Sequence, residues 1–333
     1  MAGRPTRTPN SAQRPGAPSS PCSEPGSPSG AEAAPDALAG RAGPPSVHRP
    51  GSRHGEARRG KARQGKAVRM RRMLLTATDV AAACAAWTWI PDDAELVEGE
   101  EFTIARMPEH FAWDLSVLAF TPSGPLGPAV DAVIERARAL EVPALDWEVG
   151  LGAPAGLAAE LTARGGQVKM ALDVLARDLR EDGPALPSPV ADLTVRWATD
   201  FETSRDGMAV ALTGFGGALP PVARIEARAA KDAASVPAGG GGMLVAYLDG
   251  TPVGFGDLSL LDGVARLSGG VVVPAQRGRG IYRALLDARL AYAAEHGARM
   301  AVVKGNVNTS APILRKAGFT SFGQEPIYAV PLR

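Results

Sequence analysis

The sequence contains little cysteine, histidine, aromatic side chain or net charge, and each shortage excludes a class of protein. Cys22 and Cys84 are its only cysteines and lie far apart, so neither a disulfide framework nor a zinc cluster follows, which suits a reducing cytoplasm. The four histidines show no metal-ligand spacing, and we expect no metal. A net charge of +1 gives no global reason to expect a nucleic-acid partner. The excess of alanine, glycine, proline and arginine over lysine is typical of a GC-rich bacterial gene.

Long apolar runs are also scarce. The stretch from Leu74 to Ile90 follows two arginines and superficially resembles a signal peptide. Asp79 interrupts it, a long segment precedes it, and it is shorter than the roughly 20 residues that a spanning helix needs. We therefore predict a buried helix here and a soluble protein without a membrane partner.

Residues 1–69 differ in composition from the rest of the chain. They contain 11 Pro, 10 Gly and 8 Ser, with twelve Lys and Arg against four Asp and Glu. Such a segment cannot bury enough apolar surface to offset the entropy lost on ordering, so we predict a disordered basic tail. No aromatic residues interleave with its charges, which makes a solvated tail a better interpretation than a nucleic-acid or membrane contact. Met70 and Met73 follow the tail, so an over-extended gene start is a further interpretation.

The stretch from Val271 to Leu286 predicts a strand, a glycine-containing turn and a helix. Three β-branched residues end the strand (Val271, Val272 and Val273), and Pro274 stops it because proline has no N–H for a sheet. Apolar residues then recur at helical spacing from Ile281.

The turn between strand and helix has the features of an anion site. Gly278 and Gly280 lack a Cβ, so a ligand can approach the backbone, and the first N–H groups of a helix have no partner within it. Arg277 and Arg279 add positive charge, and a pyrophosphate is the anion that we expect. The alternative is an ordinary turn with solvated arginines. No P-loop motif is present, and a dinucleotide fingerprint would require glycine where the chain has Arg283.

Two motifs carry a resemblance to a known family. The run Arg277-Gly278-Arg279-Gly280-Ile281-Tyr282 resembles the pantetheine–pyrophosphate motif Arg/Gln-x-x-Gly-x-Gly/Ala of the GCN5-related N-acetyltransferases (GNAT), with Tyr282 where the family usually has glycine or alanine. The segment from Asn306 to Phe319 resembles the later helix of that family and its closing Gly-Phe. The resemblance covers about residues 192–333. It implies an acyl-CoA N-acyltransferase fold, an α/β structure whose mixed sheet is split by a V-shaped opening for pantetheine.

The resemblance also implies a cosubstrate, acetyl-CoA, and a set of site residues. The backbone of Val271, Val272 and Val273 would pair with pantetheine, and the N–H groups from Gly278 to Tyr282 would hold the pyrophosphate, with charge from Arg277, Arg279 or Arg283. Asn306 is a candidate for a cofactor or acceptor contact, with turn chemistry as the alternative.

The general base and acid are less well defined by the resemblance. Asp257 lies in the middle of a predicted strand and is our candidate base; the alternative is an ordinary surface carboxylate. Many relatives have a tyrosine that protonates the leaving thiolate, but this chain has Leu314 at that position. Tyr282 or Ser310 would then substitute, or the thiolate leaves unassisted. We expect Phe215 and Trp197 to be core residues.

The chain contains two similar halves. Residues 128–180 resemble residues 283–331 in the order helix, strand, short helix, glycine and strand, and Gly165 and Gly318 end the short helices. Generic β/α alternation is the alternative interpretation. The first half has no arginine in Thr121–Gly127, and its prolines there remove N–H donors. We therefore predict a degenerate GNAT-like domain (74–180), a linker (181–192) and a catalytic domain (193–333) with the order β-α-α-β-β-β-α-β-α-β-β.

The favoured function is acetyl transfer from acetyl-CoA to a primary amine of a small molecule or an amino terminus, by direct attack in a ternary complex. One alternative is another acyl or aminoacyl transfer by the same fold. A second, suggested by Leu314, is a non-catalytic acyl-CoA-binding regulatory module. The sequence leaves the acceptor and the oligomeric state open.

Overall fold

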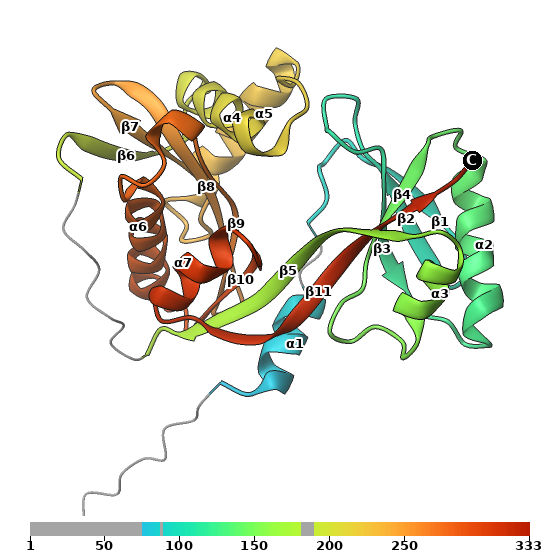
Figure 1. The fold of residues 1–333 in the computed structure, drawn as a ribbon. Coiled ribbons are helices and arrows are strands. Elements are labelled where there is room, and N and C mark those ends of the chain that lie inside the picture. The colour runs from blue at the N-terminus through green and yellow to red at the C-terminus, as the bar shows by residue number, and fades with distance from the viewer. Residues whose placement is uncertain (1–74, 87–88, 181–189) are drawn as a thin grey trace, which may run out of the picture. The chain divides into compact units, whose positions relative to one another are not determined.

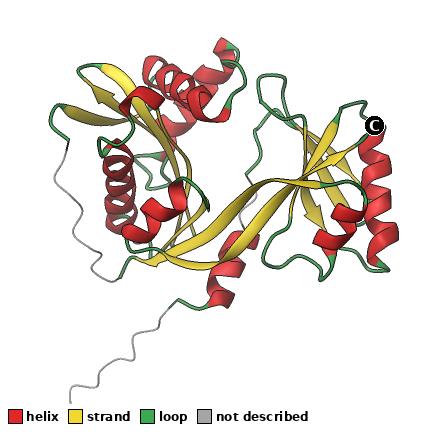
Figure 2. Cartoon of the chain, in the orientation of Figure 1, coloured by secondary structure: helices red, strands yellow, loops and turns green. Residues whose placement is uncertain are grey.

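The computed structural model describes residues 75–333 except 87–88 and 181–189. The predicted basic tail and most of the predicted linker lie outside these residues. Figures 1 and 2 show the described helices and strands. In chain order the elements are α1 (Ala77–Ala85), β1 (Glu95–Glu98), β2 (Phe102–Arg106), β3 (Leu115–Phe120), α2 (Leu126–Arg138), β4 (Ala144–Glu148), α3 (Leu157–Ala163), β5 (Gln167–Asp178), β6 (Leu193–Trp197), α4 (Phe201–Phe215), α5 (Val222–Ser235), β7 (Met243–Leu248), β8 (Thr251–Leu261), β9 (Val264–Val272), the 3-10 turn η1 (Pro274–Gln276), α6 (Ile281–Glu295), β10 (Met300–Asn306), α7 (Ser310–Lys316) and β11 (Thr320–Pro331).

The described strands form one mixed sheet in the order β1-β2-β3-β4-β11-β5-β10-β9-β8-β7-β6. Neighbouring strands are antiparallel except β3 with β4 and β9 with β10, which are parallel. Each parallel pair is joined through a helix, α2 in the first half and α6 in the second. The predicted mixed α/β sheet is therefore confirmed.

α1 is shorter than the apolar run that predicted it. It begins at Ala77, where the side chain of Thr76 accepts a hydrogen bond from the Asp79 N–H, and the Asp79 carboxylate accepts one from the Thr76 N–H. The acidic residue that interrupts the run thus belongs to the helix cap. Only Val80 and Ala83 of the helix are buried. Among the described residues, no helix has the length and apolar character needed to cross a bilayer.

The two halves of the chain exchange strands. β5 pairs through its first part with the second part of β11 and through its second part with β10 and the first part of β11. β11 in turn continues between β4 and β5, so the two long strands lie side by side (Figure 1). The predicted β-β ending of the second half is wrong in this respect. Its end is one continuous strand, because β5 of the first half occupies the second position.

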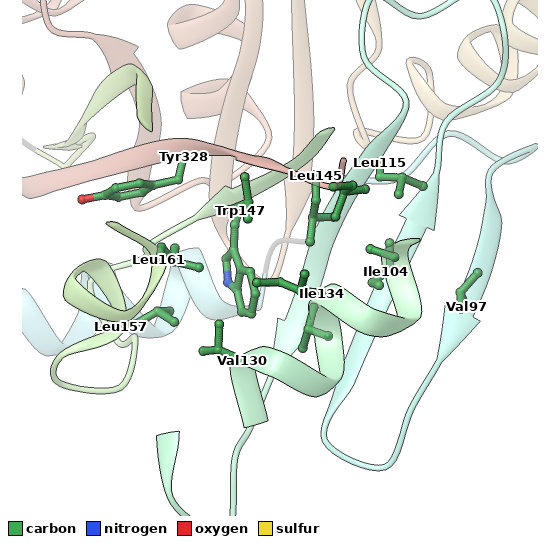
Figure 3. Packing of buried hydrophobic residues seen from close by; sticks show 14 residues of the cluster. Val97, Ile104, Leu115, Val130, Ile134, Leu145, Trp147, Leu157, Leu161 and Tyr328 are labelled. Atoms are coloured by element: carbon green, nitrogen blue, oxygen red, sulfur yellow. The ribbon is translucent and has the colours of Figure 1, made fainter. Parts of the chain in front are cut away.

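The first half has a core of its own, centred on Trp147 (Figure 3). The Trp147 indole packs edge-on against Phe120, with ring centroids 4.9 Å apart, and α2 and α3 cover it. β11 adds Tyr328 and Val330 to this core, and Leu332 follows just after the strand. The final strand of the chain therefore buries apolar surface in the half that precedes it.

Helices cover both faces of the sheet in the second half. Leu290 of α6 and Leu314 of α7 pack on the face that Val303 of β10 shares. Val302, the preceding residue, packs instead against Val80 of α1. Since successive side chains of a strand point to opposite faces, α1 lies on the face opposite α6 and α7.

The short helices of the two halves end in the same way. In α3 the N–H of Gly166 donates to the Leu161 carbonyl (2.9 Å), and after α7 the N–H of Phe319 donates to the Leu314 carbonyl (3.1 Å). Gly165 and Gly318 precede these donors with φ of 83° and 86°. Both are left-handed helix ends of the kind that glycine favours, which supports the predicted repeat.

Candidate functional site

The predicted turn forms a helix N-terminus with free backbone donors. Gly278 and Gly280 have φ of 78° and 87°, conformations that side chains other than glycine rarely adopt. Gly280 is the N-cap of α6 and provides no side-chain cap. No described group accepts a hydrogen bond from the N–H of Gly278, Arg279 or Gly280. These donors join the unpaired N–H groups of the first helical turn, an arrangement suited to an anion.

The arginines of the turn have different environments. Nε of Arg277 donates to the Val272 carbonyl (3.1 Å), so this side chain joins the turn to the end of β9. The exposed Arg279 contacts Gln276. Arg283 lies in the first turn of α6, and its Nε is buried without a hydrogen-bond partner. None of the three forms a salt bridge with a described residue, although Arg283 interacts electrostatically with Asp287 one turn further along α6.

Strands β9 and β10 separate next to this turn. Their pairing extends only from Val264–Leu267 to Met300–Val303, although β9 continues to Val272 and β10 to Asn306. The resemblance predicted such an opening in the sheet. Val273 N–H donates to Val253 of β8, so by alternation the N–H and carbonyl of Val272 point to the other edge, toward the opening. The Val272 carbonyl accepts the hydrogen bond from Nε of Arg277.

Tyr282 lies against the strand edge rather than in solvent. A Cβ built on Gly270 of β9 would lie 2.6 Å from its ring, so only glycine allows this contact. The Tyr282 hydroxyl interacts with the buried Arg289, which donates to the carbonyls of Asp257 (3.1 Å) and Ser268 (3.2 Å). Burial raises the pKa of Tyr282, so the hydroxyl stays protonated at neutral pH. The side chain of Ile281, its neighbour, is buried in the core.

Asp257, the predicted base, forms an ion pair with an arginine. Its carboxylate pairs with Arg228 of α5, which also pairs with Asp232 (2.8 Å). Asp232 is buried and accepts a hydrogen bond from the N–H of Met243 (3.0 Å). The structure thus places Asp257 in an ion-pair network that attaches α5 to the sheet.

Three other residues considered from the sequence are also placed by the structure. The side chain of Asn306 accepts a hydrogen bond from the Asn308 N–H (2.9 Å), as in the turn alternative. Trp197 packs in the core, as expected, with its ring against Tyr292. Phe215 is 49% exposed, so the expectation of a core position is wrong. It ends α4, beyond the residues that face the sheet.

Two groups near the site were not predicted. Lys304, the first residue of β10 after its pairing with β9 ends, pairs with Glu148 of β4 and with Glu325 of β11 (2.7 Å). Trp89, Phe111 and Trp113 form a ring cluster, with centroids 5.8 Å apart for Trp89–Phe111 and 5.2 Å for Phe111–Trp113. Lys304 and Glu148 are far apart in the sequence, and Trp89 is far from Phe111 and Trp113, so no local spacing indicates either group.

The loop that carries Phe111 and Trp113 contacts the segment between α4 and α5 through its backbone. The N–H of Ala218 donates to the carbonyl of His110 (2.8 Å), which lies next to Phe111. Near the end of α4, a Cβ on Gly214 would lie 2.7 Å from Val271 of β9. The end of α4 therefore lies between the ring cluster and the free edge of β9.

The corresponding turn of the first half lacks the features of an anion site. The N–H of Ser123 donates to the Glu101 carboxylate (2.7 Å), so an internal acid already occupies a donor there. An open pocket of about 250 Å³ beside it is lined by Glu100, Glu101, Phe102, Ala129 and Ala132. Two carboxylates at this position disfavour a pyrophosphate.

Two parallel strands separate beside an arginine-flanked glycine turn, and helices cover both faces of the sheet. These features define the class as the acyl-CoA N-acyltransferase fold. Residues 217–319 match the model of the acetyltransferase (GNAT) family, and this part of the chain is a GNAT domain. No curated protein matches the sequence.

Solved structures share this fold. A GCN5-related N-acetyltransferase from Kribbella flavida is 19% identical, with a TM-score of 0.52 over 78% of this chain and 96% of its own. One from Sphaerobacter thermophilus is 19% identical, with a TM-score of 0.55 over 70% and 77%. A tandem GNAT protein from the clavulanic acid biosynthesis pathway is 19% identical, with a TM-score of 0.51 over 77% and 88%.

Proposed function

We propose that the protein is an N-acetyltransferase that moves an acetyl group from acetyl-CoA to a primary amine of a small molecule or an amino terminus. The observation that carries this proposal is the free edge of β9 leading into an uncapped helix N-terminus flanked by three arginines. Acetyl-CoA offers a pyrophosphate for the helix terminus and the amides of pantetheine for the strand edge. The proposed contacts are the turn from Arg277 to Arg283 and the stretch Val271–Val273, in which the Val272 backbone points to the opening while the Val273 N–H donates to β8.

The proposed chemistry is direct attack of the amine on the thioester. Tyr282 is the proposed proton donor to the leaving thiolate, supported by its position against Gly270 and its protonated hydroxyl. Asp257 is the candidate base from the sequence, although its ion pair with Arg228 competes with that role.

The domain proposal accompanies this function. Residues 193–333 would catalyse, 181–192 would link, and 74–180 would be a degenerate GNAT-like domain that binds no cofactor. The Glu101–Ser123 contact supports the last point, because a carboxylate stands where a phosphate would bind. We therefore expect one acetyl-CoA per chain.

Calorimetry with acetyl-CoA tests the binding site. Arg279→Glu reverses an exposed charge at the turn, and we expect affinity to fall by about tenfold or more, since charge-assisted hydrogen bonds contribute about 1.5–3 kcal/mol. Arg136→Glu on α2 makes the same charge change at an exposed position and serves as the control. Equal affinities of the two variants would contradict the site.

Release of free thiol on an amine panel separates an enzyme from a binding module. The fully buried Leu314, at the position where many relatives have a tyrosine, favours the non-catalytic module as the second candidate. Because Trp89 of the ring cluster exposes 48% of its surface, the panel should include an arylalkylamine. Binding of acetyl-CoA without amine-dependent thiol release would support the module.

A further inference from the structure

The ammonium group of Lys304 pairs with two carboxylates at the point where the sheet opens. Val303 is the last residue of β10 paired with β9, so Lys304 stands at the start of the opening. Its side chain points to the face of Val302 and α1, since residues two apart in a strand share a face. There its ammonium pairs with Glu148 and Glu325.

The two carboxylates have different environments. Glu325 is sealed, with 2% of its side chain exposed, and one oxygen accepts a hydrogen bond from the Leu151 N–H (2.9 Å). Glu148 has 32% of its side chain exposed, and Lys304 is the described side chain that donates to it. Glu148 is therefore the member of the cluster that a substrate or water can reach.

The charge of the cluster favours proton uptake by Glu148. Two carboxylates share one ammonium, so the second negative charge is not compensated within the trio. Burial raises the pKa of Glu148. The negative charge of Glu325 also raises this pKa, whereas the positive charge of Lys304 lowers it. Cys84 of α1 also faces the cluster, and because burial raises the pKa of its thiol to about 11, it adds no charge at neutral pH.

The position of Glu148 relative to the opening completes the argument. The last paired residues of the two strands are Val303 of β10 and Leu267 of β9, so the opening begins at Lys304 and Ser268. Glu148 lies on β4, with β11 and β5 between that strand and β10, and its carboxylate is connected to the start of the opening through its contact with the Lys304 ammonium. Asp257 lacks this freedom, because Arg228 binds its carboxylate.

We propose that Glu148, supplied by the first half of the chain, is the base that accepts the proton of the acceptor amine. The inference rests on the proposed acetyl transfer. The acceptor ammonium passes a proton to a Glu148 oxygen, directly or through one water, and the nitrogen lone pair attacks the thioester carbonyl carbon. The C–N bond forms and the C–S bond breaks, with the sulfur leaving as a thiolate. The thiolate takes the proton of the Tyr282 hydroxyl, the second nitrogen proton restores that hydroxyl, and Glu148 returns its proton to solvent.

The test compares Glu148→Gln with Asp257→Asn in the full chain, using thiol release with phenethylamine, putrescine and a tripeptide with a free amino terminus. Glu148→Gln keeps the shape of the side chain, and Glu325 still pairs with Lys304. We expect kcat to fall about 100-fold and the decline of kcat toward acid pH to disappear, with unchanged acetyl-CoA affinity. Glu148→Asp should recover part of the rate. Glu325→Gln, which touches the same ammonium, should lower the Tm but retain the acid limb.

Each contrary outcome is distinguishable. If Glu148→Gln keeps its rate and acid limb while Asp257→Asn loses them, Asp257 is the base and the assignment to Glu148 is wrong. If Glu148→Gln mainly lowers the Tm, its role is structural. If the wild-type protein binds acetyl-CoA but releases no thiol with any of the three amines, the assignment fails as well. If it does not bind acetyl-CoA, the proposed function itself fails.

Discussion

Arg277 and Arg279 are separated by one glycine and yet have different surroundings. Arg277 donates to the carbonyl of Val272, which fixes the turn against the end of β9. Arg279 is exposed and contacts only the side chain of Gln276. The two glycines at positive φ allow this difference, because they turn the backbone sharply between strand and helix. Arg277 thus stabilises the turn, whereas Arg279 provides a positive charge that an anion can contact.

Asp287 of α6 gives a prediction at the same scale. Burial raises the pKa of Asp287 to about 6, and one of its oxygens is buried without a hydrogen-bond partner. The folded protein therefore binds this proton more tightly than the unfolded chain, so stability falls as the pH rises from about 4 to 6. Asp287→Asn removes the free-energy cost of burying an ionised carboxylate. At pH 7.5 it should raise the Tm by a few degrees, which corresponds to about 1 kcal/mol of stability, and at pH 4 it should give no gain. Thermal unfolding at both pH values is the measurement, and an equal effect at both would contradict the interpretation.

Single residues also show what the sequence could and could not predict about the site. The glycine turn was predictable, because its residues are consecutive and only certain types fit a helix N-terminus. Glu148 was not, because it meets Lys304 across 156 positions of sequence and nothing near either residue indicates the contact. Asp257 was selected for its place in a strand, but its partner Arg228 lies on another element.

At the scale of elements, most helices and strands follow from local pattern, while strand partners do not. β7 and β8 pair as a hairpin around Asp249 and Gly250, which are both at positive φ, and an Asp-Gly pair between two apolar runs is a local signal for such a turn. β5 and β11 follow Gly165 and Gly318, where strands were predicted, but nothing in their alternation indicates an exchange between halves. Pairing partners depend on which edges the rest of the sheet leaves free.

The packing of α4 gives a prediction for this scale. Gly207 and Gly214 lie on the helix face toward the sheet, where a Cβ would be 2.4 Å from Met243 and 2.7 Å from Val271. Gly207→Ala and Gly214→Ala should each destabilise the fold by about 1–3 kcal/mol through overpacking. Only Gly214→Ala displaces Val271 on the free edge of β9, so only this variant should weaken acetyl-CoA binding beyond its effect on Tm. Calorimetry and thermal unfolding of the pair provide the comparison, and equal affinities would argue against a role for this edge.

At the scale of the whole described chain, β5 and β11 make each half depend on the other. Val174 and Leu175 of β5 are fully buried between β10 and β11, although they belong to the first half. Tyr328 and Val330 of β11 are buried in the core of the first half. A half without its partner would expose these apolar positions and an unpaired strand edge, which favours aggregation.

We therefore predict that residues 1–180 and 190–333 are insoluble when produced separately but co-purify when produced together. The expected complex contains both pieces in equal amounts and elutes at the size of the uncut chain. The control omits residues 320–333 from the second piece. That removes β11 and its pairing with β4 and β5, so capture of the first piece should be lost. Size-exclusion chromatography of the tagged pieces is the measurement. Two separately folded, soluble pieces with no affinity for each other would show that the exchanged strands are dispensable, and Glu148 would then have no fixed position beside Lys304.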